Sequence, residues 1–187
     1  MPRVKNEIRI IGGTWRSRKI RFPDAPGLRP TPDRVRETLF NWLGQNLEGL
    51  VCLNLYAGSG ALGFESASRG ARRVVQVDRA PETCAALRQN CALLEARMVE
   101  IVQMEVSRFL VKPAEPFDLV FLDPPFQLGL IEPCCRLLEE KSWLAPRARI
   151  YIEAEKGKVL ENMPATWQIH RHKVTGGVGY HLYFRTG

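Results

Sequence analysis

One short run in the middle of the chain has the residue types that an amino group on a planar base needs. The apolar run 117–122 leads directly into Asp123-Pro124-Pro125-Phe126. The Asp123 carboxylate and the Pro124 carbonyl can each accept a hydrogen bond from an N–H group, and the prolines, with a fixed φ and no N–H, hold these acceptors in place. The ring of Phe126 can stack on the base. We therefore expect Asp123, Pro124 and Phe126 to be the catalytic residues.

A glycine-rich run upstream predicts a binding site for an adenosine-type cofactor. The segment 57–63, Ala-Gly-Ser-Gly-Ala-Leu-Gly, follows an apolar run, and Asp78 lies 20 positions beyond Gly58. Glycines permit a tight turn from strand to helix, and a carboxylate at the tip of the next strand can accept hydrogen bonds from ribose hydroxyls. NAD and S-adenosylmethionine both carry such a ribose. Hydride transfer has no use for the fixed acceptors at Asp123 and Pro124, so S-adenosylmethionine is the predicted cofactor.

These two motifs need a parallel sheet that brings them to one edge. From residue 50 onward, apolar runs alternate with helical patterns. The predicted strands cover 50–56, 73–78, 99–102, 117–123 and 149–153, and the predicted helices cover 61–69, 81–95 and 128–140. This alternation is typical of an α/β fold with a mostly parallel twisted sheet and helices on both faces. Two final extended runs, 167–174 and 180–185, predict a C-terminal antiparallel hairpin.

The first 48 residues follow a different pattern. Short extended pieces over 7–22 precede a proline-rich loop over 23–32. A helix is predicted over 34–46, with Asp33 as its N-cap. We therefore divide the chain into an N-terminal basic hairpin and helix extension, 1–48, and an S-adenosylmethionine-binding domain, 49–187.

Positive charge gathers in this extension. The chain has 27 Lys and Arg against 20 Asp and Glu, a formal net charge of +7. Residues 1–36 alone hold ten basic and three acidic side chains, so the rest of the chain is neutral. A basic patch on a neutral body suits a nucleic acid, and a solvated basic face is the alternative. The candidate RNA-binding residues are Arg16, Arg18, Lys19, Arg21 and Arg34.

Other kinds of site lack the residues they need. The five cysteines are odd in number and show no Cys-x-x-Cys spacing, which argues against a disulfide framework or a zinc site. His170 and His172 lie two apart on a predicted strand and so would share a face, but no third ligand is near in sequence. No apolar run approaches the roughly 18 residues that span a bilayer, and no signal-peptide pattern opens the chain. We expect a cytoplasmic protein with neither a metal nor a membrane partner.

Taken together, the motifs resemble those of one family, the bacterial small-subunit (16S) ribosomal RNA guanine-N2 methyltransferases (RsmD-like). The matching stretches are RIIGGTWR at 9–16, GLRPT at 27–31, DRVRETLFNW at 33–42, LYAGSGALG at 55–63, VDR at 77–79 and DPPF at 123–126. The resemblance covers nearly the full chain. It implies a Rossmann-like class I methyltransferase fold that uses S-adenosylmethionine and releases S-adenosylhomocysteine. It also implies a guanine in 16S ribosomal RNA as the acceptor, met within an assembled or assembling small ribosomal subunit.

The resemblance adds residues to the cofactor site. The candidate cofactor-binding residues are Arg29, Thr31, Asn54, Tyr56, Gly58, Gly60, Asp78, Arg79, Glu105 and Asp123. Two of them depart from the family pattern. Asn54 stands where an aspartate is usual, so it keeps an acceptor but lacks the charge that would favour the methionine ammonium. Glu105 is longer than the Asp or Asn that often contacts the adenine amino group.

Three other functions share parts of this pattern. A DNA adenine or cytosine amino-methyltransferase would use the same Asp-Pro-Pro-aromatic run, but this chain is short for a separate DNA-recognition domain. A catalytically idle, RNA-binding ribosome assembly factor would keep the basic extension without the chemistry. An NAD oxidoreductase would keep only the glycine turn and Asp78.

Overall fold

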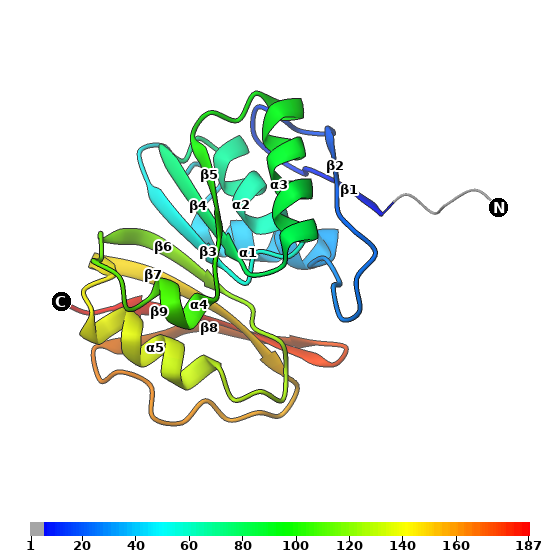
Figure 1. The fold of residues 1–187 in the computed structure, drawn as a ribbon. Coiled ribbons are helices and arrows are strands. Elements are labelled where there is room, and N and C mark those ends of the chain that lie inside the picture. The colour runs from blue at the N-terminus through cyan, green and yellow to red at the C-terminus, as the bar shows by residue number, and fades with distance from the viewer. Residues whose placement is uncertain (1–5) are drawn as a thin grey trace.

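A seven-stranded sheet forms the centre of the computed structural model, which describes residues 6–187 (Figure 1). Arg3 and Lys5 of the basic extension lie outside the described residues. In spatial order the strands are β5 (Val99–Gln103), β4 (Arg73–Asp78), β3 (Val51–Leu55), β6 (Phe117–Leu122), β7 (Leu144–Glu155), β9 (Val178–Arg185) and β8 (Trp167–Thr175). Strands β5 to β7 pair in parallel, whereas β7–β9 and β9–β8 pair antiparallel. The predicted mostly parallel sheet with a C-terminal hairpin is confirmed.

Helices cover both faces of this sheet, as the alternating pattern predicted (Figure 1). On one face lie α1 (Asp33–Leu43), α2 (Ala61–Ser68) and α3 (Pro81–Leu94), and on the other lie α4 (Val106–Phe109) and α5 (Ile131–Glu140). Strand β6 shows why both layers form. Leu119 and Phe121 pack under α1 and α2, while Val120 and Leu122 pack under α4 and α5. A strand buried on both faces reads as a nearly continuous apolar run, and 117–122 is apolar except for Asp118.

The strand order reverses direction at β3, which is flanked by β4 on one side and β6 on the other. In open α/β sheets, ligands bind outside the carboxyl ends of the strands at such a switch point. The glycine run 57–63 follows β3, and Asp123 follows β6. The fold therefore places the two predicted motifs at the same crevice.

Several element boundaries differ from the prediction. Helix α1 begins at Asp33, which does not cap it, because the carboxylate instead binds the guanidinium groups of Arg9 and Arg36. Helix α4 was not predicted, since four residues are too few to show a helical period. Strand β7 starts five residues before the predicted 149, through an irregular stretch in which Arg147 has φ of +62° and the register to β6 shifts.

The N-terminal extension contains its own two-stranded hairpin, β1 (Glu7–Arg9) and β2 (Lys19–Arg21). Ile10 and Ile20 are almost fully buried against Phe64 of α2 and Leu87 of α3. The hairpin is thus packed on the helices of the second predicted domain through an apolar contact.

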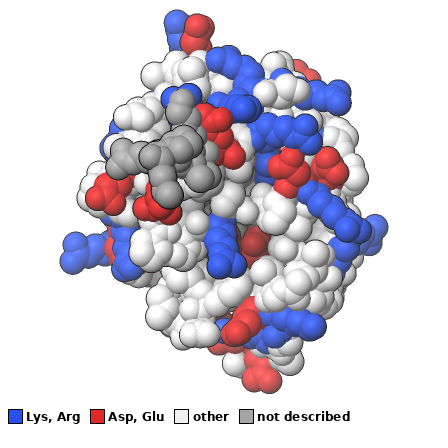
Figure 2. All heavy atoms as spheres, turned by 90° about the vertical axis from the view of Figure 1, so that its right-hand side faces the viewer, with Lys and Arg blue, Asp and Glu red and all other residues white. Residues whose placement is uncertain are grey.

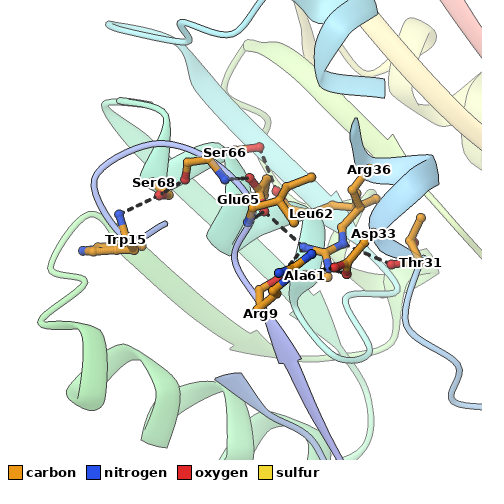
Figure 3. Close-up of polar contacts among 12 residues, drawn as sticks. Arg9, Trp15, Thr31, Asp33, Arg36, Ala61, Leu62, Glu65, Ser66 and Ser68 are labelled. Atoms are coloured by element: carbon orange, nitrogen blue, oxygen red, sulfur yellow. Dashed lines mark hydrogen bonds and ion pairs between the residues drawn. The ribbon is translucent and has the colours of Figure 1, made fainter. Parts of the chain in front are cut away.

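A buried ion cluster fixes the segment that links β1 to β2 (Figure 3). The carboxylate of Glu65 in α2 accepts hydrogen bonds from the backbone N–H groups of Ile11 and Gly12, at 3.0 and 2.8 Å. It also pairs with the guanidinium groups of Arg36 and Arg69, at 3.1 and 2.9 Å. Arg36 is therefore part of the interior, although its charge counts toward the basic extension. Within residues 6–187, no helix is both long enough and apolar enough to cross a membrane.

Candidate functional site

The candidate site lies at the carboxyl edge of the parallel strands. Strand β7 points toward the right-hand side of Figure 1, and Figure 2 shows that side face-on. This face is hollowed near its middle, with acidic atoms recessed in the hollow and Lys and Arg side chains around it (Figure 2). A hollow of this kind at a strand-order switch point is the expected location for a ligand.

The glycine turn and Asp78 are in direct contact. The backbone N–H of Gly58 donates to one Asp78 carboxylate oxygen at 3.0 Å, and the N–H of Ala80 donates to the other at 2.9 Å. Each oxygen keeps lone-pair capacity for a further donor such as a ribose hydroxyl. Residues 20 positions apart in sequence thus form one surface.

Two glycines of this turn are needed for different reasons. Gly60 has φ of +76°, and a Cβ there would lie 2.4 Å from Leu87, so packing excludes any side chain. Gly58 has φ of +54°, but a Cβ there would meet nothing closer than 3.9 Å. The backbone at Gly58 therefore borders open space that a side chain would fill. This cradle and the free lone pairs of Asp78 fit the ribose end of an adenosine-type cofactor.

Asn54 and Tyr56 are turned toward the interior. The Asn54 amide donates to Gln76 Oε1 at 3.0 Å beneath the glycine turn, and Gln76 Nε2 has no partner among the described residues. The Tyr56 hydroxyl contacts the Cys134 thiol of α5 at 3.5 Å, and burial raises the pKa of this phenol. Tyr56 has φ of +58°, so its backbone starts the turn that Gly58 continues.

Arg79 and Glu105 meet at the far side of Asp78. Their side chains form an ion pair at 3.4 Å, in which the Arg79 side chain is 72% exposed and the Glu105 side chain 37%. An exposed pair of this kind contributes little to stability, so either side chain remains able to contact a ligand.

Asp123 lies beside a second carboxyl group that the sequence analysis missed. Leu122 of β6 pairs with Ile152 of β7, so Asp123 and Glu153 follow side by side. Glu153 is only 6% exposed, and its Oε1 accepts hydrogen bonds from Thr31 Oγ1 at 3.0 Å and the Tyr151 hydroxyl at 3.1 Å. The only signal for it was an acid in the apolar run 150–154, at a position that faces the same side of the sheet as Tyr151.

Burial and mutual repulsion alter the acidity of this pair. Burial raises the pKa of Asp123 well above its usual range, and the charge of Glu153 raises it further. Burial also raises the pKa of Glu153 to about 7, although the hydrogen bonds from Thr31 and Tyr151 lower it. Two carboxyl groups so close titrate as a unit, so we infer that the pair retains a proton near neutral pH.

The loop before α1 bridges the two halves of the site. Thr31 is buried on Glu153, while the side chain of Leu28 lies 4.0 Å from where a Gly58 Cβ would be. Arg29 lies between them in the chain and is exposed. Beyond Asp123, Pro124 is buried and Phe126 is 36% exposed, so the aromatic ring is accessible.

The predicted RNA-binding residues are all exposed, but they do not form one cluster. Lys19 and Arg21 share Glu7 as an ion-pair partner, at 3.4 and 2.9 Å. Arg18 donates to the carbonyl of Leu93 in α3. Arg16 lies in the same hairpin, whereas Arg34 lies on α1 and lines a groove with Lys173 of β8.

The expectation that His170 and His172 share a face of a strand is wrong. A register irregularity between Ile169 and Arg171 inserts an extra residue into β8. His170 consequently stacks on Phe184 and His172 on His181, three positions apart in β9 and thus on opposite faces. Over residues 6–187, no group of three or more His, Cys, Asp or Glu side chains is arranged to hold a metal ion.

Comparison with known proteins identifies close relatives. A family model described as conserved hypothetical protein 95 matches residues 8–184. The ribosomal RNA small subunit methyltransferase D of Escherichia coli K12 is 49% identical over 181 residues, which cover 96% of this chain and 90% of that protein. The protein of the same name in Haemophilus influenzae is 44% identical and covers 97% of this chain and 96% of its own.

Solved structures similar to this chain include a member at high sequence identity and more distant methyltransferases. The Escherichia coli protein yhhF has 47% identity and a TM-score of 0.90, covering 96% of this chain and 98% of its own. A precorrin methyltransferase of Geobacter metallireducens, at 19% identity and a TM-score of 0.68 over 88% of this chain and 95% of its own, shares the fold alone. The predicted Rossmann-like class I methyltransferase fold is confirmed.

Proposed function

Because this chain belongs to the conserved hypothetical protein 95 (RsmD) family of methyltransferases, we propose that it methylates the exocyclic N2 amino group of a guanine in 16S ribosomal RNA. The observation that carries the proposal is the geometry of the carboxyl edge. There, the contact between Gly58 and Asp78 adjoins Asp123 and Pro124 across the switch point between β3 and β6. The relatives named as small-subunit ribosomal RNA methyltransferases support the choice of substrate.

We infer that groups at this edge hold S-adenosylmethionine, which supplies an activated methyl group from its sulfonium centre when bound. The Asp78 carboxylate accepts hydrogen bonds from the ribose hydroxyls, and the backbone at Gly58 and Gly60 borders the cofactor. Around them lie the other proposed contacts, which are Arg29, Thr31, Asn54, Tyr56, Arg79, Glu105 and Asp123. Asn54 contributes through its carboxamide oxygen, since its N–H is directed to Gln76.

Asp123, Pro124 and Phe126 hold the acceptor base. The guanine amino nitrogen is a poor nucleophile because its lone pair is delocalised into the ring. Its N–H groups would donate to the Asp123 carboxylate and the Pro124 carbonyl, which favours a tetrahedral nitrogen with a localised lone pair. The exposed Phe126 ring stacks on the base, which must leave its own stack in the RNA to enter the site. The proton that the nitrogen loses passes to Asp123.

The basic side chains of the hairpin bind the RNA backbone. Arg16, Arg18, Lys19 and Arg21 are exposed on the N-terminal hairpin, and Arg34 is exposed on α1. Such charges position an RNA without reading its sequence. The substrate is the RNA within an assembled or assembling small subunit, in the cytoplasm.

Transfer of a labelled methyl group tests the proposal. Small subunits and free 16S RNA from a strain that lacks this gene are incubated with the protein and radiolabelled S-adenosylmethionine, with DNA as a parallel substrate. Mass spectrometry of the digested nucleosides should show N2-methylguanosine. A label on DNA adenine or cytosine would support the DNA enzyme instead. RNA binding without any label would support an assembly factor.

Calorimetry separates the cofactors. S-adenosylmethionine should bind and NAD should not, because the acceptors at Asp123 and Pro124 serve an amino group and not a hydride. The reverse result would contradict the assignment of the cofactor.

A further inference from the structure

A groove separates α1 from the β8–β9 hairpin, on the face of the sheet that carries α1. The buried rings of Tyr151 and Tyr180, together with apolar side chains of α1, form its floor. Its rim includes Arg34 and Trp42 from α1 and Lys173 from β8. The groove therefore combines two cations and an aromatic side chain above an apolar floor.

This groove leads to the carboxyl pair of the candidate site. Glu153 pairs in register with Tyr180 of β9, and Tyr180 pairs in register with Lys173 of β8. Side chains paired in this way lie on the same face of a sheet. Lys173 thus lies two strand spacings, roughly 10 Å, from Glu153. The Tyr151 hydroxyl at the groove floor donates to Glu153 at 3.1 Å, so groove and site share a wall.

The groove also opens at the edge of the sheet where the site lies. The turn of the β8–β9 hairpin, at Gly176 and Gly177, lies at the carboxyl edge of β7, because β9 begins where β7 ends. This turn is on the right-hand side of Figure 1. Arg34 lies in the first turn of α1, and the loop before α1 binds Glu153 through Thr31. A strand of nucleic acid whose base enters the site can therefore continue into the groove.

The two cations of the groove are available to an external anion. Arg34 and Lys173 are exposed, and within residues 6–187 neither forms an ion pair. In contrast, Lys19 and Arg21 of the N-terminal hairpin share Glu7. An anion between two like charges is attracted to both and offsets their repulsion. The carboxyl pair of the site repels the same anion, so the groove and not the site is its place.

We propose that this groove binds the single-stranded RNA next to the target guanine, with a backbone phosphate between Arg34 and Lys173 and a flanking base on the Trp42 ring. Arg and Lys bind phosphates, and aromatic rings stack on bases of any sequence. Trp42 is partly exposed and follows Arg34 by about two turns of α1, so the two share a face of the helix. The inference rests on the proposed function, and its contacts lie on other elements than those of the N-terminal hairpin.

The salt dependence of RNA binding tests the phosphate contact without turnover. Free 16S RNA and small subunits from the deletion strain are titrated with the wild type and with a double variant, Arg34→Gln with Lys173→Gln. Each lost phosphate contact flattens the plot of log K against log salt by about 0.7 for a single strand, so the double variant should lose roughly 1.4. Arg136→Gln, exposed on α5 over the other face of the sheet, should keep the wild-type slope. A wild-type slope in the double variant would overturn the proposal.

Two substitutions of Trp42 test the stacking contact separately from the charges. Trp42→Phe keeps an aromatic ring and should keep most of the affinity for RNA. Trp42→Leu keeps an apolar side chain without a ring and should weaken RNA binding by about tenfold, with an unchanged salt slope. Because Trp42 also packs against the core, urea denaturation of both variants checks that they are folded. Wild-type RNA affinity in Trp42→Leu would contradict the stacking contact.

Ultraviolet crosslinking of the wild type to RNA needs no variant and separates this inference from the proposed function. Peptides from α1 and β8 should be attached to nucleotides next to the target guanine. Crosslinks confined to the N-terminal hairpin, together with normal methyl transfer, would overturn the inference alone. Groove crosslinks without methyl transfer would overturn the proposed function alone. If the double variant loses affinity for small subunits but not for free 16S RNA, the groove binds a ribosomal protein and the RNA proposal is wrong.

Discussion

Two buried glutamates show how differently this chain treats the same side chain. Glu65 in α2 is fully buried, yet two guanidinium groups and two backbone N–H groups surround it. Glu153 in β7 is nearly as buried, but its neighbours are hydroxyl groups and another carboxyl. The first charge is compensated and holds the fold together. The second has no guanidinium or ammonium partner within residues 6–187, and burial raises its pKa to about 7 beside a carboxyl group whose pKa is raised as well.

The buried ion cluster around Glu65 and the neighbouring end of α2 also explain why glycines occupy positions 12 and 13, between β1 and β2. A Cβ at Gly12 would lie 2.3 Å from the guanidinium of Arg69, and one at Gly13 would lie 1.8 Å from the Ser68 carbonyl oxygen. The segment thus lies directly on α2, and it binds there through Ser68 as well as Glu65. Part of the stretch 9–16 therefore packs the hairpin onto α2, and only the outward side chains of this stretch are available to RNA.

The largest expected effect is a loss of unfolding free energy when the buried ion cluster around Glu65 is broken. Glu65→Gln leaves Arg69 buried without a carboxylate partner and leaves Arg36 with Asp33 alone, and removing one partner of a buried ion pair costs about 3–5 kcal/mol of unfolding free energy. Urea denaturation measures the loss. Glu37→Gln on the exposed surface of α1 is the matched control and should be nearly neutral. A fully stable E65Q would mean that the cluster contributes no more than an apolar contact does.

Asp123→Asn changes the carboxyl pair at the proposed site and should lower kcat. The new amide N–H faces the N–H of the base, and losing one preorganised polar contact typically costs about 10²–10³ in kcat. Stability should not fall, because the swap removes a carboxyl group from beside Glu153. The methyl-transfer assay and a denaturation curve measure both, with Asp24→Asn in the exposed loop as control. Wild-type turnover in D123N would move the chemistry away from this residue.

Asp78→Ala should weaken S-adenosylmethionine binding by about 1.5–3 kcal/mol, the range for a hydrogen bond to a charged group. Calorimetry measures this affinity. Asp78→Asn keeps one acceptor oxygen for Gly58 or a ribose hydroxyl and should lie between Ala and the wild type. Equal affinity in all three proteins would remove Asp78 from the cofactor site.

The smallest effect per residue is expected on the outer side of the N-terminal hairpin. Neutralising Arg16, Arg18, Lys19 and Arg21 should raise the KM for RNA and flatten its salt dependence by roughly 0.7–0.9 log units per lost phosphate contact. Arg16→Gln alone should show it most cleanly, since Lys19 and Arg21 already pair with Glu7. Lys141→Gln, exposed after α5, is the control. An unchanged salt slope would make the hairpin surface a solvated face only.

Local sequence rules predicted most of the elements and much of the proposed site. Apolar runs and turn residues located the strands of the parallel sheet, because a strand buried on both faces and a glycine turn are each recognisable over a few residues. Local predictions were wrong where tertiary contacts competed with the local sequence preference. Asp33 gives its carboxylate to Arg9 and Arg36 instead of capping α1, and a bulge in β8 sends His170 and His172 to opposite faces.

The sequence by itself determined the order of strands and helices, the glycine turn with its distant Asp78, and the Asp123-Pro124-Pro125-Phe126 run, since each follows from short-range rules of backbone and side-chain chemistry. Only the tertiary structure decided which residues distant in sequence are neighbours. It placed Glu153 beside Asp123 and bound it to Thr31, 122 positions away, and it drew Arg36 into the core to meet Glu65. The reason is physical: the charge state of a buried group depends on what surrounds it, and strand pairing and burial create those surroundings.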